Sequence, residues 1–214
     1  MRFAVLPAAG KSERMGRPKL VLPLGERTVL ECLLDALRQA EVEHLLVVVG
    51  PHGSDLVPLA RGAGAHVHRL EDETPDMRAT VERGLRWLED RFSPRDEDAW
   101  LLIPADHPIV LPSVIGELER ARQTSPKRSI FVPTFQGRRG HPLALTWQHI
   151  AGIREHPSFE GLNAYVRKQA AQVREVPIES ESILWDLDTP DDYERLQRLW
   201  SSARGSARSS EGPV

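Results

Sequence analysis

The sequence predicts an α/β protein with a largely parallel sheet, and two observations carry that prediction. Short apolar runs alternate along the chain with segments whose apolar residues recur at helical spacing, which is the pattern of strand–helix–strand units. The run at residues 45–49 is apolar throughout and is closed by Gly50 and Pro51, as expected of a strand that helices cover on both faces. The 214 residues suit one well-buried domain better than two.

The expected elements follow in order along the chain. Strands are predicted at residues 2–6, 45–49, 65–68, 100–103, 130–132, 143–145 and 173–176. Helices are predicted at residues 29–37, 54–61, 77–91, 112–122, 159–168 and 191–200. Thr28 is placed to cap the first of these helices, and Pro112 suits the first turn of the fourth. Residues beyond 200 lack apolar periodicity, so we expect one domain at residues 1–200 and a disordered tail at residues 201–214.

Composition narrows the class of protein. Basic and acidic residues nearly balance, 28 against 31, for a net charge of −3, so no global field attracts nucleic acid or an anionic membrane. The single cysteine, Cys32, excludes disulfides within the chain and thiolate metal clusters, and its apolar neighbours predict that it is buried. No apolar stretch approaches the ~20 residues that span a bilayer. We expect a cytoplasmic protein that binds neither nucleic acid nor membranes.

Residues 8–19 read Ala-Ala-Gly-Lys-Ser-Glu-Arg-Met-Gly-Arg-Pro-Lys and join the first strand to a helical pattern. The two glycines allow backbone N–H groups to approach an anion, and the loop adds a hydroxyl and flexible cations. This combination predicts a loop that holds the phosphates of a nucleoside triphosphate, through Ala8, Ala9, Gly10, Lys11, Ser12, Arg14, Gly16 and Lys19. The alternative is a solvated basic connection between two elements.

This loop differs from two other phosphate-binding loops. The triplet Gly10-Lys11-Ser12 imitates the end of a Walker A motif, but that motif needs a glycine where this chain has Val5, inside the expected strand. The two glycines are also too far apart for the Gly-x-Gly-x-x-Gly of a dinucleotide site. A P-loop NTPase and a dinucleotide-binding enzyme are therefore not expected.

Carboxylates stand at two further places where they would reach the same cleft. Asp106 follows the strand at 100–103, and ligands of open α/β sheets bind at the carboxyl ends of strands. Asp186 and Asp188 precede the last helix and would point the same way in an extended segment. Mg²⁺ prefers such oxygen ligands and keeps several waters, so we expect it on Asp106 with one or both of Asp186 and Asp188. Closing a turn is the alternative role for Asp106.

Two other segments are candidates for ligand contacts. Arg78 and Thr80 open the helix at 77–91, where side chains and backbone N–H groups can meet a base or a phosphate; an ordinary helix start is the alternative. Gly140-His141-Pro142 interrupts a hairpin-like region. The glycine allows close approach of a ligand, so we expect this turn to contact a ligand, unless the histidine only shapes the turn.

Together these motifs resemble the nucleotidyltransferases that use an Ala-Ala-Gly-x-Ser-x-Arg-Met-Gly-x-x-Lys loop, which residues 8–19 match completely. Ala105-Asp106-His107-Pro108, Gly140-His141-Pro142 and Asp186-Leu187-Asp188-Thr189-Pro190 are similar to the molybdenum-cofactor cytidylyltransferase group of the MobA-like NTP transferases. The chain departs from that group at residues 75–80, where the group has Gly-Met-x-x-Ser, and at residues 158–163, where it has Gly-Asp-x-Gly-Ala-Arg. Methylerythritol phosphate cytidylyltransferases are the second resemblance, and a nucleotidyltransferase that acts on methylerythritol phosphate or on a sugar phosphate is the alternative.

The resemblance implies a Rossmann-like fold and an enzyme that moves a nucleoside monophosphate from an NTP, CTP being favoured, to a phosphorylated acceptor such as molybdopterin. Arg14, Lys19 and Asp106 are then the catalytic residues, and Mg²⁺ is the cofactor. A transient contact with an enzyme that receives the finished cofactor is a further expectation. The alternative from another class is a non-catalytic nucleotide-binding or cofactor-delivery module.

Overall fold

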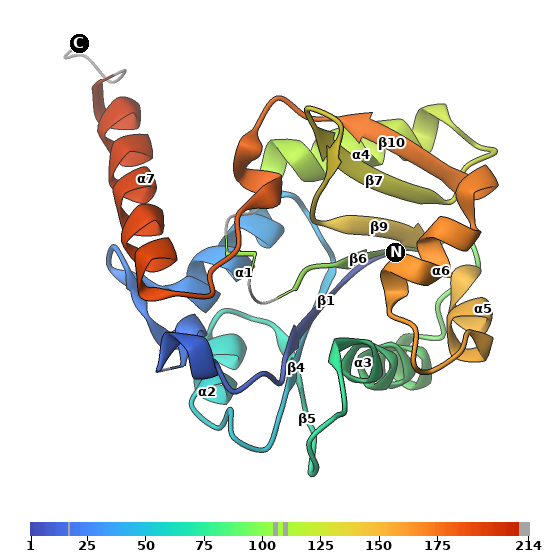
Figure 1. Cartoon of the computed structure of the whole chain (residues 1–214), viewed down its shortest axis with the longest axis horizontal. Helices are drawn as coiled ribbons and strands as arrows, with labels where there is room; N and C mark the ends of the chain where they lie inside the picture. The colour runs from blue at the N-terminus through green and yellow to red at the C-terminus, as the bar shows by residue number, and fades with distance from the viewer. Residues whose placement is uncertain (17, 105–106, 109–110, 210–214) are drawn as a thin grey trace.

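The computed structural model describes residues 1–16, 18–104, 107–108 and 111–209 (Figure 1). The strands of its main sheet are β1 (Arg2–Ala8), β4 (His44–Val49), β5 (His66–Arg69), β6 (Ala99–Leu102), β7 (Ile130–Phe135), β8 (Arg138–Arg139), β9 (Leu143–Thr146) and β10 (Val173–Pro177). The helices are α1 (Val29–Gln39), α2 (Leu56–Gly62), α3 (Met77–Phe92), α4 (Pro112–Thr124), α5 (His149–Glu155), α6 (Leu162–Lys168) and α7 (Pro190–Ser209). These elements confirm the predicted α/β class.

The sheet has the order β10-β7-β9-β6-β1-β4-β5, and β8 pairs with β7. Strand β1 is hydrogen-bonded to parallel neighbours on both sides, β4 and β6. Strand β9 runs antiparallel to both of its neighbours, β6 and β7. The predicted strand pair at 130–132 and 143–145 is therefore confirmed, with Ile130 opposite Leu145.

Helices cover both faces of the sheet, because alternate residues of each strand point to opposite sides. On β1, Ala4 and Leu6 belong to the core that packs against α1, α2 and α4. Phe3 and Val5 belong to the core on the other face, beneath α3, α5 and α6. Cys32 is buried in the first of these cores, as predicted.

The start of α1 shows how local sequence fixes an element. The Thr28 side chain accepts the Glu31 N–H, and the Glu31 carboxylate accepts the Thr28 N–H at 2.8 Å, which forms a capping box. Each helix begins with N–H groups that have no partner within the helix, and this reciprocal pair satisfies two of them. Pro112 occupies the first turn of α4, also as predicted.

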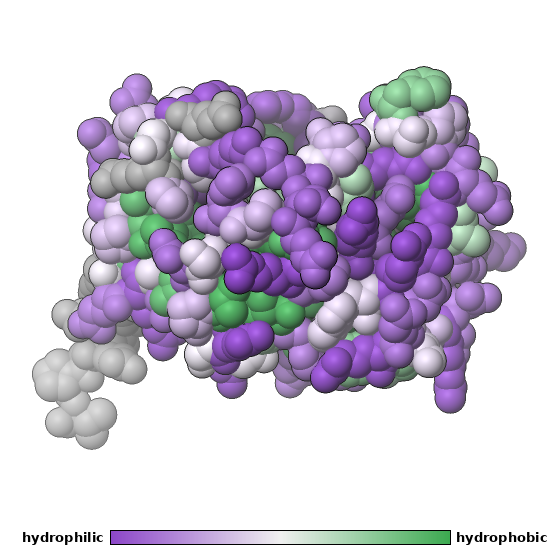
Figure 2. All heavy atoms as spheres, turned by 90° about the horizontal axis from the view of Figure 1, so that it is seen from below, coloured by the Kyte–Doolittle hydropathy of each residue, from purple (hydrophilic) through white to green (hydrophobic). Residues whose placement is uncertain are grey.

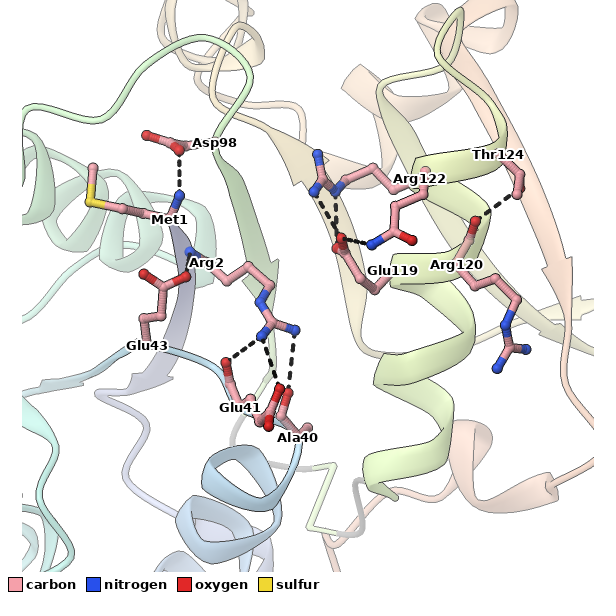
Figure 3. Close-up of polar contacts among 11 residues, drawn as sticks. Met1, Arg2, Ala40, Glu41, Glu43, Asp98, Glu119, Arg120, Arg122 and Thr124 are labelled. Atoms are coloured by element: carbon pink, nitrogen blue, oxygen red, sulfur yellow. Dashed lines mark hydrogen bonds and ion pairs between the residues drawn. The ribbon is translucent and has the colours of Figure 1, made fainter.

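Polar contacts fasten the amino end of β1 (Figure 3). The amino group of Met1 donates to Asp98 at 2.5 Å, directly before β6. The Arg2 guanidinium donates to the carbonyl oxygens of Ala40 and Glu41, which follow α1. These contacts join the start of β1 to the segments that precede β6 and β4. They lie at the edge of the sheet where these strands begin, opposite the edge where the strands end.

Several elements differ from the sequence prediction, which contains neither strand β8 nor the separate two-stranded sheet of β2 (Pro23–Leu24) and β3 (Arg27–Thr28). Helix α5 was not predicted, since its seven residues include Gly152 and two β-branched isoleucines, which are weak helix formers. The last helix also differs, since α7 continues to Ser209, beyond the predicted end at residue 200. Extending an existing helix needs no new nucleus, and the alanines and arginines of this stretch favour it. Figure 1 shows α7 projecting from the body of the molecule.

Hydrophilic side chains cover most of the face shown in Figure 2, and apolar side chains are visible between them near its middle. Within the described residues, no helix is both long and apolar enough to cross a lipid bilayer. The sheet ends at β5, a strand of four residues that carries His66 and His68.

Histidines of β4 and β5 lie among aromatic rings. His44 stacks on Phe3 with ring centroids 5.0 Å apart and lies 4.1 Å from the ring of Phe92. His66 lies 5.5 Å from the ring of Trp87. Burial among these rings lowers the pKa of His44, His66 and His68 below the ordinary value, because the charged form is poorly solvated there.

We expect acid to destabilise the fold between pH 7 and pH 5. The unfolded chain protonates its histidines near their ordinary pKa of about 6.5, whereas the folded chain takes up those protons only at lower pH. Stability is therefore complete above that pH and falls as the pH drops below it. Thermal melting should show a midpoint lower by on the order of several degrees at pH 5. A flat profile over this range would contradict the assignment.

Candidate functional site

The loop at the carboxyl end of β1 folds back on itself. Ser12 and Gly16 both have positive φ angles, 54° and 68°, which few residues other than glycine adopt without cost. The carbonyl oxygen of Ser12 accepts the Met15 N–H at 3.1 Å, and its hydroxyl accepts the Lys19 N–H at 3.3 Å. The serine therefore joins the middle of the loop to its carboxyl end at Lys19.

Asp188 joins this loop to the segment before α7. Its Oδ1 lies 3.2 Å from Lys19 Nζ, and its Oδ2 lies 2.8 Å from an Arg14 guanidinium nitrogen. The Lys19 side chain is only 15% exposed, whereas that of Arg14 is 72% exposed. Thr189 and Asp192 cap the start of α7, with the Thr189 N–H donating to Asp192 Oδ2 at 2.8 Å. The Asp188 N–H donates to the same oxygen at 3.1 Å, so this cap also holds the backbone of Asp188.

Asp186 faces a different partner. Its Oδ1 lies 3.1 Å from His107 Nε2, and its carboxylate is 57% exposed. The structure thus distinguishes the two carboxylates. Asp188 contacts the loop at residues 8–19, which is called the nucleotide loop after its predicted role, and Asp186 contacts His107. Asp106 itself lies outside the described residues, so its predicted place beside them stays a prediction.

A cavity of about 630 Å³ opens at the carboxyl ends of β1, β4 and β5. Seven of the predicted nucleotide-binding residues line it: Ala8, Ala9, Gly10, Lys11, Ser12, Lys19 and Thr80. Arg14, Gly16 and Arg78 are not among its lining residues. The structure therefore brings seven of the predicted residues to one cavity, and their contact with a nucleotide stays a prediction. The sequence analysis missed part of the cavity wall, which includes His52, Gly53, Asp55, Thr74, Asp76 and Met77.

The missed wall had a signal in the sequence. Residues 50–53, Gly-Pro-His-Gly, follow directly after β4, and the carboxyl ends of parallel strands meet at one edge of a sheet. The same argument that selected residues 8–19 therefore also applies to this turn. A Cβ on Gly50 would lie 3.0 Å from the carbonyl oxygen of Ala9, so the glycine lets the turn pack closely against the nucleotide loop.

One carboxylate ties together the three loops at the mouth of the cavity. Glu73 Oε1, in the segment between β5 and α3, lies 2.8 Å from Lys11 Nζ and 2.8 Å from His52 Nε2. Hydrogen bonds from Lys11 and His52 lower the pKa of Glu73, so this carboxylate stays ionised well into the acid range. The pairs are exposed to solvent, where such contacts contribute little stability and a ligand can displace them.

Arg78 does not contact the cavity, which corrects its predicted role in nucleotide binding. Its side chain is 5% exposed, and the guanidinium donates to carbonyl oxygens between Ile153 and Glu160. Thr80 keeps its predicted place, with its hydroxyl 2.5 Å from that of Thr74. Sequence spacing indicated that the first turn of α3 faces the site, but not which side of that turn each residue occupies.

The Gly140-His141-Pro142 turn packs against the segment that leads to Asp186. A Cβ on Gly140 would lie 2.2 Å from the carbonyl oxygen of Ile183, and the His141 N–H donates to that same oxygen at 2.9 Å. The His141 ring centroid lies 4.3 Å from that of His107. Burial, with the neighbouring His107, lowers the pKa of His141 to about 3, so the ring is neutral at pH 7 and offers an acceptor no positive charge.

The loop, the cavity and the two aspartates agree with what sequence comparison finds. The chain belongs to the MobA-like NTP transferase domain family, whose model matches residues 4–173. It is therefore a nucleotidyltransferase, and the alternative of a non-catalytic module is set aside. The purine catabolism protein PucB of Bacillus subtilis is 26% identical over 93% of this chain and 97% of its own. The phosphoenolpyruvate guanylyltransferase of Conexibacter woesei is 27% identical over 98% of this chain and 93% of its own.

Solved structures show the same Rossmann-like architecture. Rv0371c of Mycobacterium tuberculosis superposes with a TM-score of 0.75 at 28% identity, covering 92% of this chain and 97% of its own. The same protein has also been crystallised with manganese, at a TM-score of 0.71 and 27% identity over 92% and 98% of the two chains. A 4-diphosphocytidyl-2C-methyl-D-erythritol synthase superposes with a TM-score of 0.71 at 17% identity, over 92% and 97%, and shows the fold alone.

Three cations of the loop should differ in their importance for nucleotide binding. Lys19 and Arg14 share Asp188, whereas Lys11 pairs with Glu73 at the exposed mouth of the cavity. We expect Lys19→Ala and Arg14→Ala to raise the Kd for NTP about 10-fold to 100-fold, as removal of a charge-assisted contact does. Lys11→Ala should raise it less than about 3-fold, because only the lysine of a true Walker A motif would be required at position 11, and the loop lacks the glycine of that motif. Calorimetric titration measures all three, and a Lys11 effect larger than the others would restore the P-loop hypothesis.

Proposed function

We propose that this enzyme transfers a nucleoside monophosphate from an NTP to a phosphorylated small-molecule acceptor in a Mg²⁺-dependent reaction that releases pyrophosphate. An oxygen of the acceptor phosphate attacks the α-phosphorus, and the bond to the pyrophosphate oxygen breaks. The acceptor is already an anion, so no protein nucleophile is required. Catalysis then consists of positioning the reactants and stabilising charge.

The contact of Asp188 with both Lys19 and Arg14 carries this proposal. This contact brings a carboxylate from the far end of the chain to Lys19 and Arg14 of the nucleotide loop. The loop lines the cavity described above. Lys19 and Arg14 would hold the triphosphate and stabilise the leaving pyrophosphate. Burial of Lys19 supports this role, because a partly desolvated cation attracts phosphate more strongly than an exposed one.

The carboxylates present suit a divalent ion. Asp106 and Asp188 would hold it, with Asp186 held back by His107, and oxygen ligands of this kind are those that Mg²⁺ prefers. A bound ion would supply charge neutralisation at the phosphates. Manganese in the crystals of Rv0371c supports the use of a divalent metal in this family. That the metal of this enzyme is Mg²⁺ is our proposal.

The donor base and the acceptor have two sources of support. Resemblance to the molybdenum-cofactor group favours CTP and molybdopterin, and the guanylyltransferase relative favours GTP and phosphoenolpyruvate. Gly140, His141 and Pro142 are proposed to border the acceptor. Because His141 is neutral, it would contact the acceptor by packing or by a single hydrogen bond and not by ion pairing.

A pyrophosphate-release screen tests the function directly. Each of the four NTPs is mixed with the enzyme, MgCl₂ and one of three acceptors, namely molybdopterin, phosphoenolpyruvate or methylerythritol phosphate. We expect release with one NTP and one acceptor that exceeds the release without acceptor by at least about 100-fold. Release that is equal with and without every acceptor would contradict transfer to an acceptor of these kinds.

Asp188 and Asp186 provide a matched pair of carboxylates. We expect Asp188→Asn to lower kcat/KM by about 100-fold to 1000-fold, as loss of a preorganised charged contact does, and Asp106→Ala to lower it at least as far. Asp186→Asn should change it less than about 10-fold, because this carboxylate faces His107. Steady-state kinetics with the NTP and acceptor selected by the screen measure the order, and a larger effect of Asp186→Asn would reverse the assignment.

A further inference from the structure

Arg78 is a buried cation that the reaction does not explain. Its side chain is 5% exposed, and a buried guanidinium is costly unless its N–H groups are paired. Here every nitrogen of the group has a partner. The Nε donates to Glu82 at 2.7 Å, and the two terminal nitrogens donate to the carbonyl oxygens of Ile153, His156, Pro157 and Glu160 at 2.6, 2.7, 2.5 and 2.8 Å.

These carbonyls belong to the end of α5 and to the segment after it, residues 156–161. In an α-helix the Ile153 carbonyl would accept the N–H of the residue four positions later, but that residue is Pro157, which has no N–H. The guanidinium supplies the missing donor. It also draws the carbonyls of residues 156, 157 and 160 toward a single point, so it fixes the path of the whole segment.

The other side of the same helical turn forms a wall of the cavity. Asp76, Met77 and Thr80 flank Arg78 in the sequence and line the cavity. Asp76 caps the turn by accepting the Ala79 N–H at 2.8 Å, and the Thr80 hydroxyl bonds to Thr74. One rigid turn therefore presents one set of residues to the nucleotide cavity and Arg78 to residues 156–161.

The segment held by Arg78 carries Phe159, which is 86% exposed. A phenyl ring that projects into solvent has no packing of its own to hold it in place. The segment is therefore held elsewhere. The guanidinium binds the carbonyls of residues 156, 157 and 160, and the side chain of Glu160 pairs with His156 and Lys168.

We propose that Arg78 is a positioning residue that couples NTP binding in the cavity to the order of residues 156–161. The ligand is the NTP of the proposed function, on which this inference rests. A nucleotide that packs against the first turn of α3 holds that turn still, and the guanidinium transmits the restraint to the four carbonyls. Coupling between two sites is reciprocal, so loosening the segment must weaken nucleotide binding by the same factor.

Chymotrypsin cleavage after Phe159 reports the order of the segment. The fragment that ends at residue 159 is quantified by mass spectrometry, without nucleotide and with saturating CTP or GTP and MgCl₂. We expect nucleotide to slow cleavage of the wild type by about 3-fold or more, since cleavage follows local opening. Arg78→Lys keeps the charge but cannot reach all the carbonyls. It should speed cleavage by about 10-fold, abolish the protection and raise the Kd for NTP by about 3-fold to 10-fold.

The matched control is Arg86→Lys, a change at an exposed arginine of the same helix, which should leave cleavage, protection and Kd unchanged. Wild-type enzyme that binds NTP without any change in cleavage at Phe159 would overturn the coupling. So would an Arg78→Lys variant that is cleaved faster yet binds NTP with unaltered Kd, because Arg78 would then serve local stability alone. Wild-type enzyme that binds none of the four NTPs would instead refute the proposed function.

If Arg78→Lys does not fold, as judged by circular dichroism, Glu82→Gln takes its place. This change keeps the guanidinium but removes the charge that orients it through Nε. We expect a smaller loss of protection with the same sign, and full protection in this variant would count against the coupling. The comparison of wild-type cleavage with and without nucleotide decides in either case.

Discussion

Parallel pairing of β1 with a neighbour on each side constrains everything at the site. Residues 3–8 pair with β4 and residues 2–5 pair with β6, and β5 pairs in parallel with β4. The loop at residues 8–19, the turn at 50–53 and the segment at 73–76 follow β1, β4 and β5, so they converge at the edge of the sheet where these strands end. None of them needs regular structure of its own, because each is held at its start by a strand of the sheet. The cavity is the space that these loops leave between them.

Three described cations of the loop have carboxylate partners in the free protein. Asp188 pairs with Lys19 and Arg14, and Glu73 pairs with Lys11. At these three side chains a triphosphate would therefore replace one set of anions by another. Part of the attraction is offset by the pairs that are lost, which limits the affinity for inorganic anions that cannot also fill the cavity. Selectivity for a complete nucleotide follows from this exchange, since only a base and ribose add contacts that the carboxylates cannot supply.

Sequence patterns located the longer strands of the main sheet, most helices and the loop at residues 8–19, because these depend on local periodicity and on the rule that ligands bind at the carboxyl ends of parallel strands. They could not separate Asp186 from Asp188, whose partners His107 and Lys19 come from distant parts of the chain. They also misplaced Arg78, since helical spacing shows that a turn approaches a site but not which of its sides does so. Helix α5 was not predicted because its residues have weak helix propensity. The helix is stabilised by contacts with Arg78, with Tyr165 and with the core beneath the sheet.

The reversed direction of β9 decides at which edge of the sheet the segments before and after it lie. Because β9 runs against its neighbours, the turn at 140–142 opens at the same edge as the nucleotide loop, while α5 begins at the opposite edge, where residues 147 and 148 bond to the segment before β6. The turn that we propose to border the acceptor thus lies on a separate stretch of chain from the loop that we propose to hold the nucleotide, and the shared sheet joins the two. A substitution in one stretch leaves the strand pairing that anchors the other in place.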